Sequence, residues 1–122
     1  MRRASSRYAA LAVAAVALLF GLVGTSVAAT GVVRATPSAT WNPSTKVVQT
    51  GDRIVWVNGT DEPHTVTSIS DNWSKDSFMV PGGSVTAFTF EAPGLYSYRC
   101  TIHSALIGDR CLGMCGRIGV NE

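Results

Sequence analysis

The sequence predicts a small all-β protein, an antiparallel β-sandwich, preceded by an N-terminal export signal. Beyond residue 29, prolines, glycines and short polar clusters recur roughly every eight to twelve residues. Runs of β-branched and aromatic residues lie between these turn signals, and no amphipathic helical pattern lasts more than a turn or two. This spacing is typical of a sandwich of short strands.

The first 29 residues have the three parts of a secretory signal peptide. A basic start with three arginines is followed by an uncharged apolar run, Ala9 to Gly24, and by small residues up to Ala29. We expect cleavage after Ala29 or near it, which leaves residues 30–122 as one domain. An uncleaved membrane anchor is the alternative, but the run is shorter than the ~20 residues that span a bilayer.

The export prediction places the domain in the periplasm, outside the cell or in the cell envelope. The Arg2-Arg3 pair leaves both the general and the twin-arginine route open. We expect contact with a membrane only if the N-terminal segment stays uncleaved.

The charge of the predicted domain differs from that of the whole chain. The chain has a net charge of +2, but residues 30–122 carry seven Lys/Arg and eight Asp/Glu, a net of −1. Without a basic patch, there is no electrostatic case for nucleic-acid binding. The domain is predicted to be a monomer, and its small core favours help from a metal or a disulfide.

The predicted strands follow one another along the domain. They are Gly31–Thr36, Ser44–Asp52, Arg53–Asn58, His64–Ile69, Ser84–Phe90, Leu95–Cys100 and Gly116–Val120. Arg53–Asn58 is apolar on both faces, which predicts a central strand. The Ala92-Pro93-Gly94 turn is predicted to close a hairpin between the strands on either side of it. Ile69–Met79 is a polar crossover that could hold a short helix.

Metal-binding residue types occur at the ends of predicted strands. Cys100 and His103 are three residues apart directly after one strand, and His64 begins another. In a sandwich these strand ends can meet at one pole, where two imidazoles and a thiolate would bind copper. Met114 can add a weak thioether ligand. Two histidines, a cysteine and a weak axial methionine form the pattern of a type 1 copper site, which transfers electrons.

The segments around these residues resemble the cupredoxins, in particular the plastocyanin, amicyanin and pseudoazurin branch. They are VWVNGTDEPHTV (Val55–Val66), FMVPGGSVTAFTF (Phe78–Phe90), GLYSYRCTIH (Gly94–His103) and GMCGRIGV (Gly113–Val120), within a match from about Lys46 to Val120. The resemblance implies a Greek-key sandwich with one type 1 copper at one end. It implies an electron carrier rather than an enzyme, serving redox partner proteins that the sequence does not identify.

Residue by residue, the resemblance implies His64, Cys100, His103 and Met114 as the copper ligands. It also implies that Thr65 bridges the two ligand segments and that His103 is the electron port.

The chain departs from the family between the second histidine and the methionine. Met114 follows His103 by eleven positions, with SALIGDRCLG between them, where the family has only a few residues. We align Met114 as the axial ligand across this insertion, while three-coordinate copper or an axial backbone oxygen stays open. Leu106, Ile107 and Leu112 within it would form either an apolar docking patch or the buried side of the insertion.

The two remaining cysteines allow two interpretations. A Cys111–Cys115 disulfide would leave Cys100 free as a thiolate, and an exported protein meets conditions in which disulfides persist. The disulfide requires a non-helical turn, which Gly113 permits. Alternatively, both cysteines could join Cys100 and His103 in a structural Cys₃His zinc site that leaves His64 unused. A third alternative is a copper-binding or delivery module that does not shuttle electrons.

Overall fold

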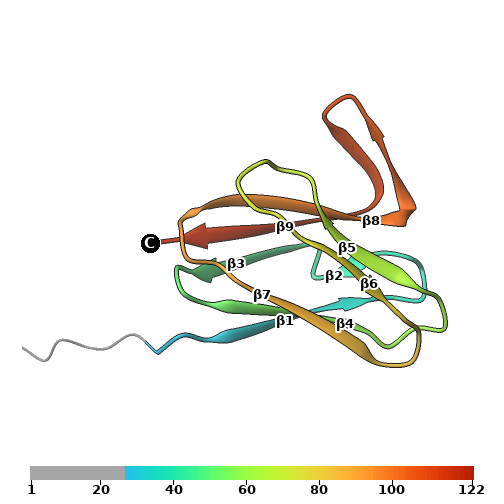
Figure 1. Cartoon of the computed structure of the whole chain (residues 1–122), viewed down its shortest axis with the longest axis horizontal. Helices are drawn as coiled ribbons and strands as arrows, with labels where there is room; N and C mark the ends of the chain where they lie inside the picture. The colour runs from blue at the N-terminus through green and yellow to red at the C-terminus, as the bar shows by residue number, and fades with distance from the viewer. Residues whose placement is uncertain (1–26) are drawn as a thin grey trace, which may run out of the picture.

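In the computed structural model, which describes residues 27–122, nine strands form two packed sheets (Figure 1). These residues contain no helix, and so none that could cross a membrane. The predicted all-β sandwich is therefore confirmed. Most of the predicted signal peptide, residues 1–26, lies outside the described residues.

The four-stranded sheet has the order β2-β1-β4-β7. Its strands are β1 (Thr30–Ala35), β2 (Trp41–Asn42), β4 (Arg53–Asn58) and β7 (Ser84–Thr89). As its two-sided apolar pattern predicts, β4 is an inner strand, with Ile54 and Trp56 fully buried. It runs parallel to β1 and antiparallel to β7.

The five-stranded sheet has the order β3-β9-β8-β5-β6 and carries the predicted metal-binding residues. Its strands are β3 (Thr45–Gln49), β5 (His64–Ser68), β6 (Asp76–Met79), β8 (Gly94–Ile107) and β9 (Arg110–Asn121). β3 runs parallel to β9, so each sheet is mixed, although antiparallel pairs predominate.

Two local predictions were wrong. The turn at residues 92–94 does not close a hairpin, because β7 pairs with β4 in one sheet while β8 pairs with β5 and β9 in the other. The chain crosses between the layers at this turn. The segment Ile69–Met79 contains no helix and ends in strand β6, which pairs with β5.

The core is an aromatic cluster between the two sheets. Trp73 makes edge contacts with Phe88, Tyr96 and Tyr98, at centroid distances of 5.2, 6.0 and 6.3 Å. Trp56 lies 5.3 Å from Tyr98 in a T-shaped arrangement. Such rings bury large apolar areas, so they supply most of the driving force available to a domain this small.

The insertion is a β-hairpin and not a loose loop. β8 and β9 pair beyond the sandwich as far as Ile107↔Arg110, and this ribbon rises away from one end of the molecule (Figure 1). We call residues 104–113 the hairpin tip. Leu106, Ile107 and Leu112 are all exposed there, so they do not bury the insertion.

Asp52 ties the N-terminal end of the described chain to the sandwich. Its carboxylate accepts hydrogen bonds from the amides of Gln49 and Ala29, both at 2.8 Å. These bonds, that of Gln49 first, lower the pKa of Asp52 because they stabilise the carboxylate. The carbonyl of Ala29 accepts a further hydrogen bond from the Arg53 amide, so both the amide and the carbonyl of Ala29 are hydrogen-bonded.

Candidate metal centre

Three side chains converge where β5 begins and where the pairing of β8 is interrupted. His64 is the first residue of β5, and Cys100 and His103 lie within a register shift between Arg99 and Ser104. Such an irregularity re-aims side chains that a regular strand would send to opposite faces. One donor atom from each of the three residues lies within 4.8 Å of the others.

The two imidazoles face the sulfur with the same ring nitrogen. The Sγ of Cys100 lies 3.8 Å from Nδ1 of His64 and 3.5 Å from Nδ1 of His103. Cys100 is the free cysteine of residues 27–122, since the other two are paired. One thiolate and two imidazole nitrogens at one point form a donor set that fits copper.

The two histidines differ in their exposure to solvent. His64 and Cys100 are buried, whereas the side chain of His103 is 23% exposed. Burial, followed by the neighbouring His103, lowers the pKa of His64 despite the opposing effect of Glu62. The neutral imidazole is the form that binds a metal, so this environment prepares His64 as a ligand.

Thr65 links the two segments that carry the histidines, as predicted. Its amide lies 3.3 Å from the Sγ of Cys100 and donates a hydrogen bond to it. Its hydroxyl accepts a hydrogen bond from the amide of Thr101 at 2.9 Å. The thiolate therefore has a fixed donor on the side of β5, and hydrogen bonds of this kind tune the potential of a type 1 site.

The turn after β4 supplies two groups that sequence reasoning missed. The Oγ1 of Thr60 lies 2.9 Å from Nε2 of His64, and the carboxylate of Glu62 lies 3.1 Å from Nε2 of His103. Both imidazoles thus present Nδ1 to the sulfur and have Nε2 occupied by the same turn. The only signal in the sequence was the closeness of Thr60 and Glu62 to His64, because the contact with His103 depends on the fold.

Met114 is fully buried in the same core cluster as Cys100. Along β9, Met114, Gly116, Ile118 and Val120 are buried while the residues between them are not, so Met114 faces inward. It directly precedes Cys115, the partner of Arg99 in the ladder, and therefore lies beside the strand segment that carries Cys100. The insertion thus leaves Met114 on the inner face at the level of the metal site.

Gly113 explains how the chain enters this position. Its φ of 98° is in the region that favours glycine, and a Cβ there would collide with the carbonyl oxygen of His103. The absence of a side chain lets β9 approach the backbone of His103 closely. The disulfide was predicted to need a non-helical turn, but both cysteines lie in strand β9, and the positive φ of Gly113 between them supplies the irregularity instead.

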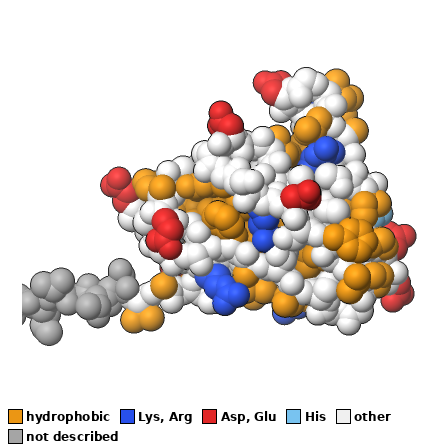
Figure 2. Space-filling model, viewed as in Figure 1, with side chains coloured by type: hydrophobic (Ala, Val, Ile, Leu, Met, Phe, Trp, Pro, Cys, Tyr) orange, Lys and Arg blue, Asp and Glu red, His pale blue; other side chains and the backbone are white. Residues whose placement is uncertain are grey.

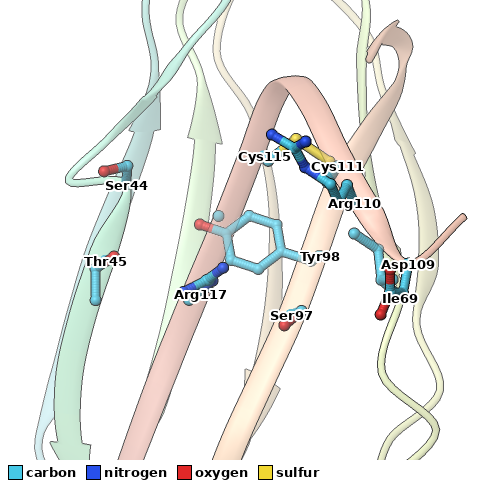
Figure 3. Close-up of a pocket in the computed structure, with 11 residues that line it drawn as sticks. Ser44, Thr45, Ile69, Ser97, Tyr98, Asp109, Arg110, Cys111, Cys115 and Arg117 are labelled. Atoms are coloured by element: carbon cyan, nitrogen blue, oxygen red, sulfur yellow. A yellow bond between two sulfur atoms is a disulfide. The ribbon is translucent and has the colours of Figure 1, made fainter. Parts of the chain in front are cut away.

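The predicted Cys111–Cys115 disulfide is present, with the two Cα atoms 6.1 Å apart. This pairing takes both thiols away from the alternative zinc site with Cys100 and His103, so that interpretation was wrong. The disulfide borders a groove of about 470 Å³ whose lining also includes Arg110, Arg117, Ser97 and Tyr98 (Figure 3). None of the three converging residues lines this groove.

A model of the copper-binding proteins of the plastocyanin/azurin family matches residues 29–121. The chain belongs to this family. The match covers all nine strands and every residue described above as part of the candidate metal centre. Copper is therefore its cofactor, and His64, Cys100 and His103, with Met114 buried in β9, are arranged as in a type 1 copper site.

Solved cupredoxin structures share the fold. A reduced amicyanin mutant is 24% identical with a TM-score of 0.62, over 75% of this chain and 82% of that chain. A purple cupredoxin from Nitrosopumilus maritimus is 20% identical with a TM-score of 0.58, over 75% of this chain and 99% of that chain. The cupredoxin sandwich inferred from the motifs is thereby confirmed.

Proposed function

We propose that this protein carries single electrons through one type 1 copper bound by His64, Cys100 and His103, with Met114 as a weak axial ligand. The observation that carries the proposal is the convergence of one donor atom from each of these three residues within 4.8 Å, with both Nδ1 atoms facing the Sγ of Cys100. A thiolate between two imidazoles suits both copper oxidation states. Copper held by these residues would supply one-electron chemistry between Cu(II) and Cu(I), with the electron coming from a donor protein and passing to an acceptor.

The surroundings support electron transfer more than copper storage. Cys100 and Met114 are fully buried, and hydrogen bonds between Thr65, Cys100 and Thr101 fix both ligand segments. A dry, fixed site would keep reorganisation small when copper changes its oxidation state. His103 is the one partly exposed member of the cluster and would be the port for electrons.

We further propose that the protein is exported and that its redox partner docks around His103. Figure 2 shows hydrophobic and acidic side chains gathered at one edge of the view. Of the two histidines, His103 is partly exposed and His64 is buried. Exposed apolar side chains near that end include Phe78, Val80 and Ile102. An apolar surface around the port would bring the partner's redox centre close while excluding water.

Adding Cu(II) to purified metal-free protein tests the function. We expect an intense visible thiolate-to-copper band, which Cys100→Ser abolishes and His64→Ala weakens or shifts. The Cys111→Ser/Cys115→Ser double variant is the control, and it should keep the band because both sulfurs lie outside the cluster. Absence of the band in the wild type would reject the type 1 site.

The same titration separates a copper-delivery module from an electron carrier. A delivery module would bind copper with unchanged affinity after Cys100→Ser. An electron carrier would lose both the band and reversible one-electron voltammetry in that variant.

A further inference from the structure

Glu62 occupies an unusual place for an exposed acid. Its side chain is 63% exposed, yet Oε2 lies 3.1 Å from Nε2 of His103. The other nitrogen of that ring, Nδ1, lies 3.5 Å from the Sγ of Cys100. The ring is thus contacted on its solvent side by a carboxylate and on its inner side by the sulfur of the metal site.

The backbone of Glu62 is fixed even though its side chain is exposed. Its carbonyl accepts hydrogen bonds from Nδ2 of Asn58 at 2.9 Å and from Oγ1 of Thr60 at 3.1 Å. Its amide lies 3.3 Å from the Thr60 hydroxyl and donates to it. Asn58 is completely buried, so the turn that places the carboxylate is anchored in the interior.

Asp61 shows that the contact does not follow from negative charge alone. It is also an exposed acid of the same turn, but no hydrogen bond or ion pair of its side chain is found among residues 27–122. One acid of the pair contacts the imidazole and the other does not. The turn therefore selects Glu62 by geometry.

We propose that Glu62 is a positioning residue for the copper ligand His103. Its carboxylate accepts a hydrogen bond from the Nε2–H group, which selects the tautomer with an unprotonated Nδ1 and holds the ring toward the metal. The carboxylate also increases the electron density of the imidazole, which stabilises Cu(II) relative to Cu(I). The inference rests on the proposed copper site, but its first consequence is measurable without the metal.

The first experiment measures the His103 tautomer in metal-free protein by long-range proton–nitrogen NMR of histidine-labelled samples at fixed, slightly alkaline pH. We expect protonated Nε2 and unprotonated Nδ1 in the wild type and in Asp61→Asn. Glu62→Ala should give a mixture of tautomers. Glu62→Gln should retain much of the wild-type pattern, because its amide oxygen still accepts a hydrogen bond. An unchanged tautomer in Glu62→Ala would overturn the proposal.

The second experiment compares copper-loaded variants. We expect Glu62→Ala to raise the reduction potential and to weaken Cu(II) binding by about 10-fold or more, the usual effect of removing such a partner. Asp61→Asn makes the same change in net charge as Glu62→Gln, one position away, and should leave both quantities close to the wild-type values. A rise in potential as large in Asp61→Asn as in Glu62→Ala would overturn the contact in favour of a general charge effect.

The two experiments distinguish the inference from the function on which it rests. If the wild type forms no type 1 site, both the proposed function and the copper role of Glu62 are rejected. If the site forms normally and neither the tautomer nor the potential depends on Glu62, only the inference fails.

Discussion

The two segments that flank the metal centre are held in place by different means. The turn from Asn58 to His64 is fixed by hydrogen bonds of buried polar side chains. The hairpin tip, residues 104–113, consists of partly or fully exposed residues and is fixed by cross-strand pairing and the Cys111–Cys115 disulfide. A short turn can be anchored by hydrogen bonds to buried side chains, whereas a ribbon that extends beyond the sandwich has no buried side chains to hold it.

Asn58→Ala should have the largest effect on stability, because it removes the interior anchor of the turn. The Asn58 amide donates to the carbonyls of Glu62, Met79 and Val80, and its oxygen accepts from Thr60. Leaving these buried groups without partners should lower the free energy of unfolding by about 3 kcal/mol or more. Urea denaturation of the metal-free protein measures this loss in the free energy of unfolding.

Asn72 provides the matched control for this prediction. Its amide also donates to a carbonyl, that of Leu95, but on the surface. Asn72→Ala should cost less than about 1 kcal/mol, because water can replace the lost donor. Similar losses in the two variants would contradict the view that the turn is anchored by burial.

Bound copper should couple the turn from Asn58 to His64 with the hairpin tip, so that the two segments unfold together. A ligand that binds only the folded state at 100 times its dissociation constant stabilises that state by about 2.7 kcal/mol. We expect this increase in unfolding free energy for the wild type and none for Cys100→Ser at the same copper concentration. Protection of backbone amides should increase both near His64 and near Met114.

Removal of the disulfide should have a smaller and more local effect. The loop-entropy relation for a ring of about five residues gives a loss of about 2 kcal/mol for Cys111→Ser/Cys115→Ser. We expect hydrogen exchange to accelerate more within the hairpin tip than in β4 and β5. Equal acceleration in both places would show that the hairpin supports the whole sandwich.

Replacing the apolar side chains of the hairpin tip should have the smallest effect on stability. Leu106 and Leu112 are 42% and 44% exposed, so each change to serine should alter the free energy of unfolding by at most about 0.5 kcal/mol. The copper band should stay as in the wild type. Ile118→Val, in the core, is the reference change and should cost about 1 kcal/mol.

The ligand types and the fold class could be predicted from the sequence because both are encoded locally. His64 and Cys100 were predicted at strand ends, where β5 begins and where the pairing of β8 breaks off. The spacing of turn signals was enough for a sandwich. Identifying Cys111–Cys115 as a pair required only the predicted export and the odd number of cysteines.

Long-range pairing was not available from the sequence. A turn such as Ala92-Pro93-Gly94 reverses the chain but does not state whether the next strand stays in the same sheet. The contact between Glu62 and His103 joins two segments 41 positions apart, and only the fold brings them together. By contrast, the Gly108-Asp109 pair at the end of the ribbon is a recognisable hairpin signal that the prediction did not use.

The hydrogen bonds of Ala29 bear on how the exported protein would be matured. Its amide donates to Asp52 and its carbonyl accepts from Arg53, so removing Ala29 with a signal peptide would break both bonds. A cut one residue earlier, after Ala28, would instead convert that amide into an ammonium group beside the carboxylate. We therefore expect the mass of the exported protein to correspond to a chain that begins at Ala29. Processing would then add to the fold a charge pair that the precursor does not have.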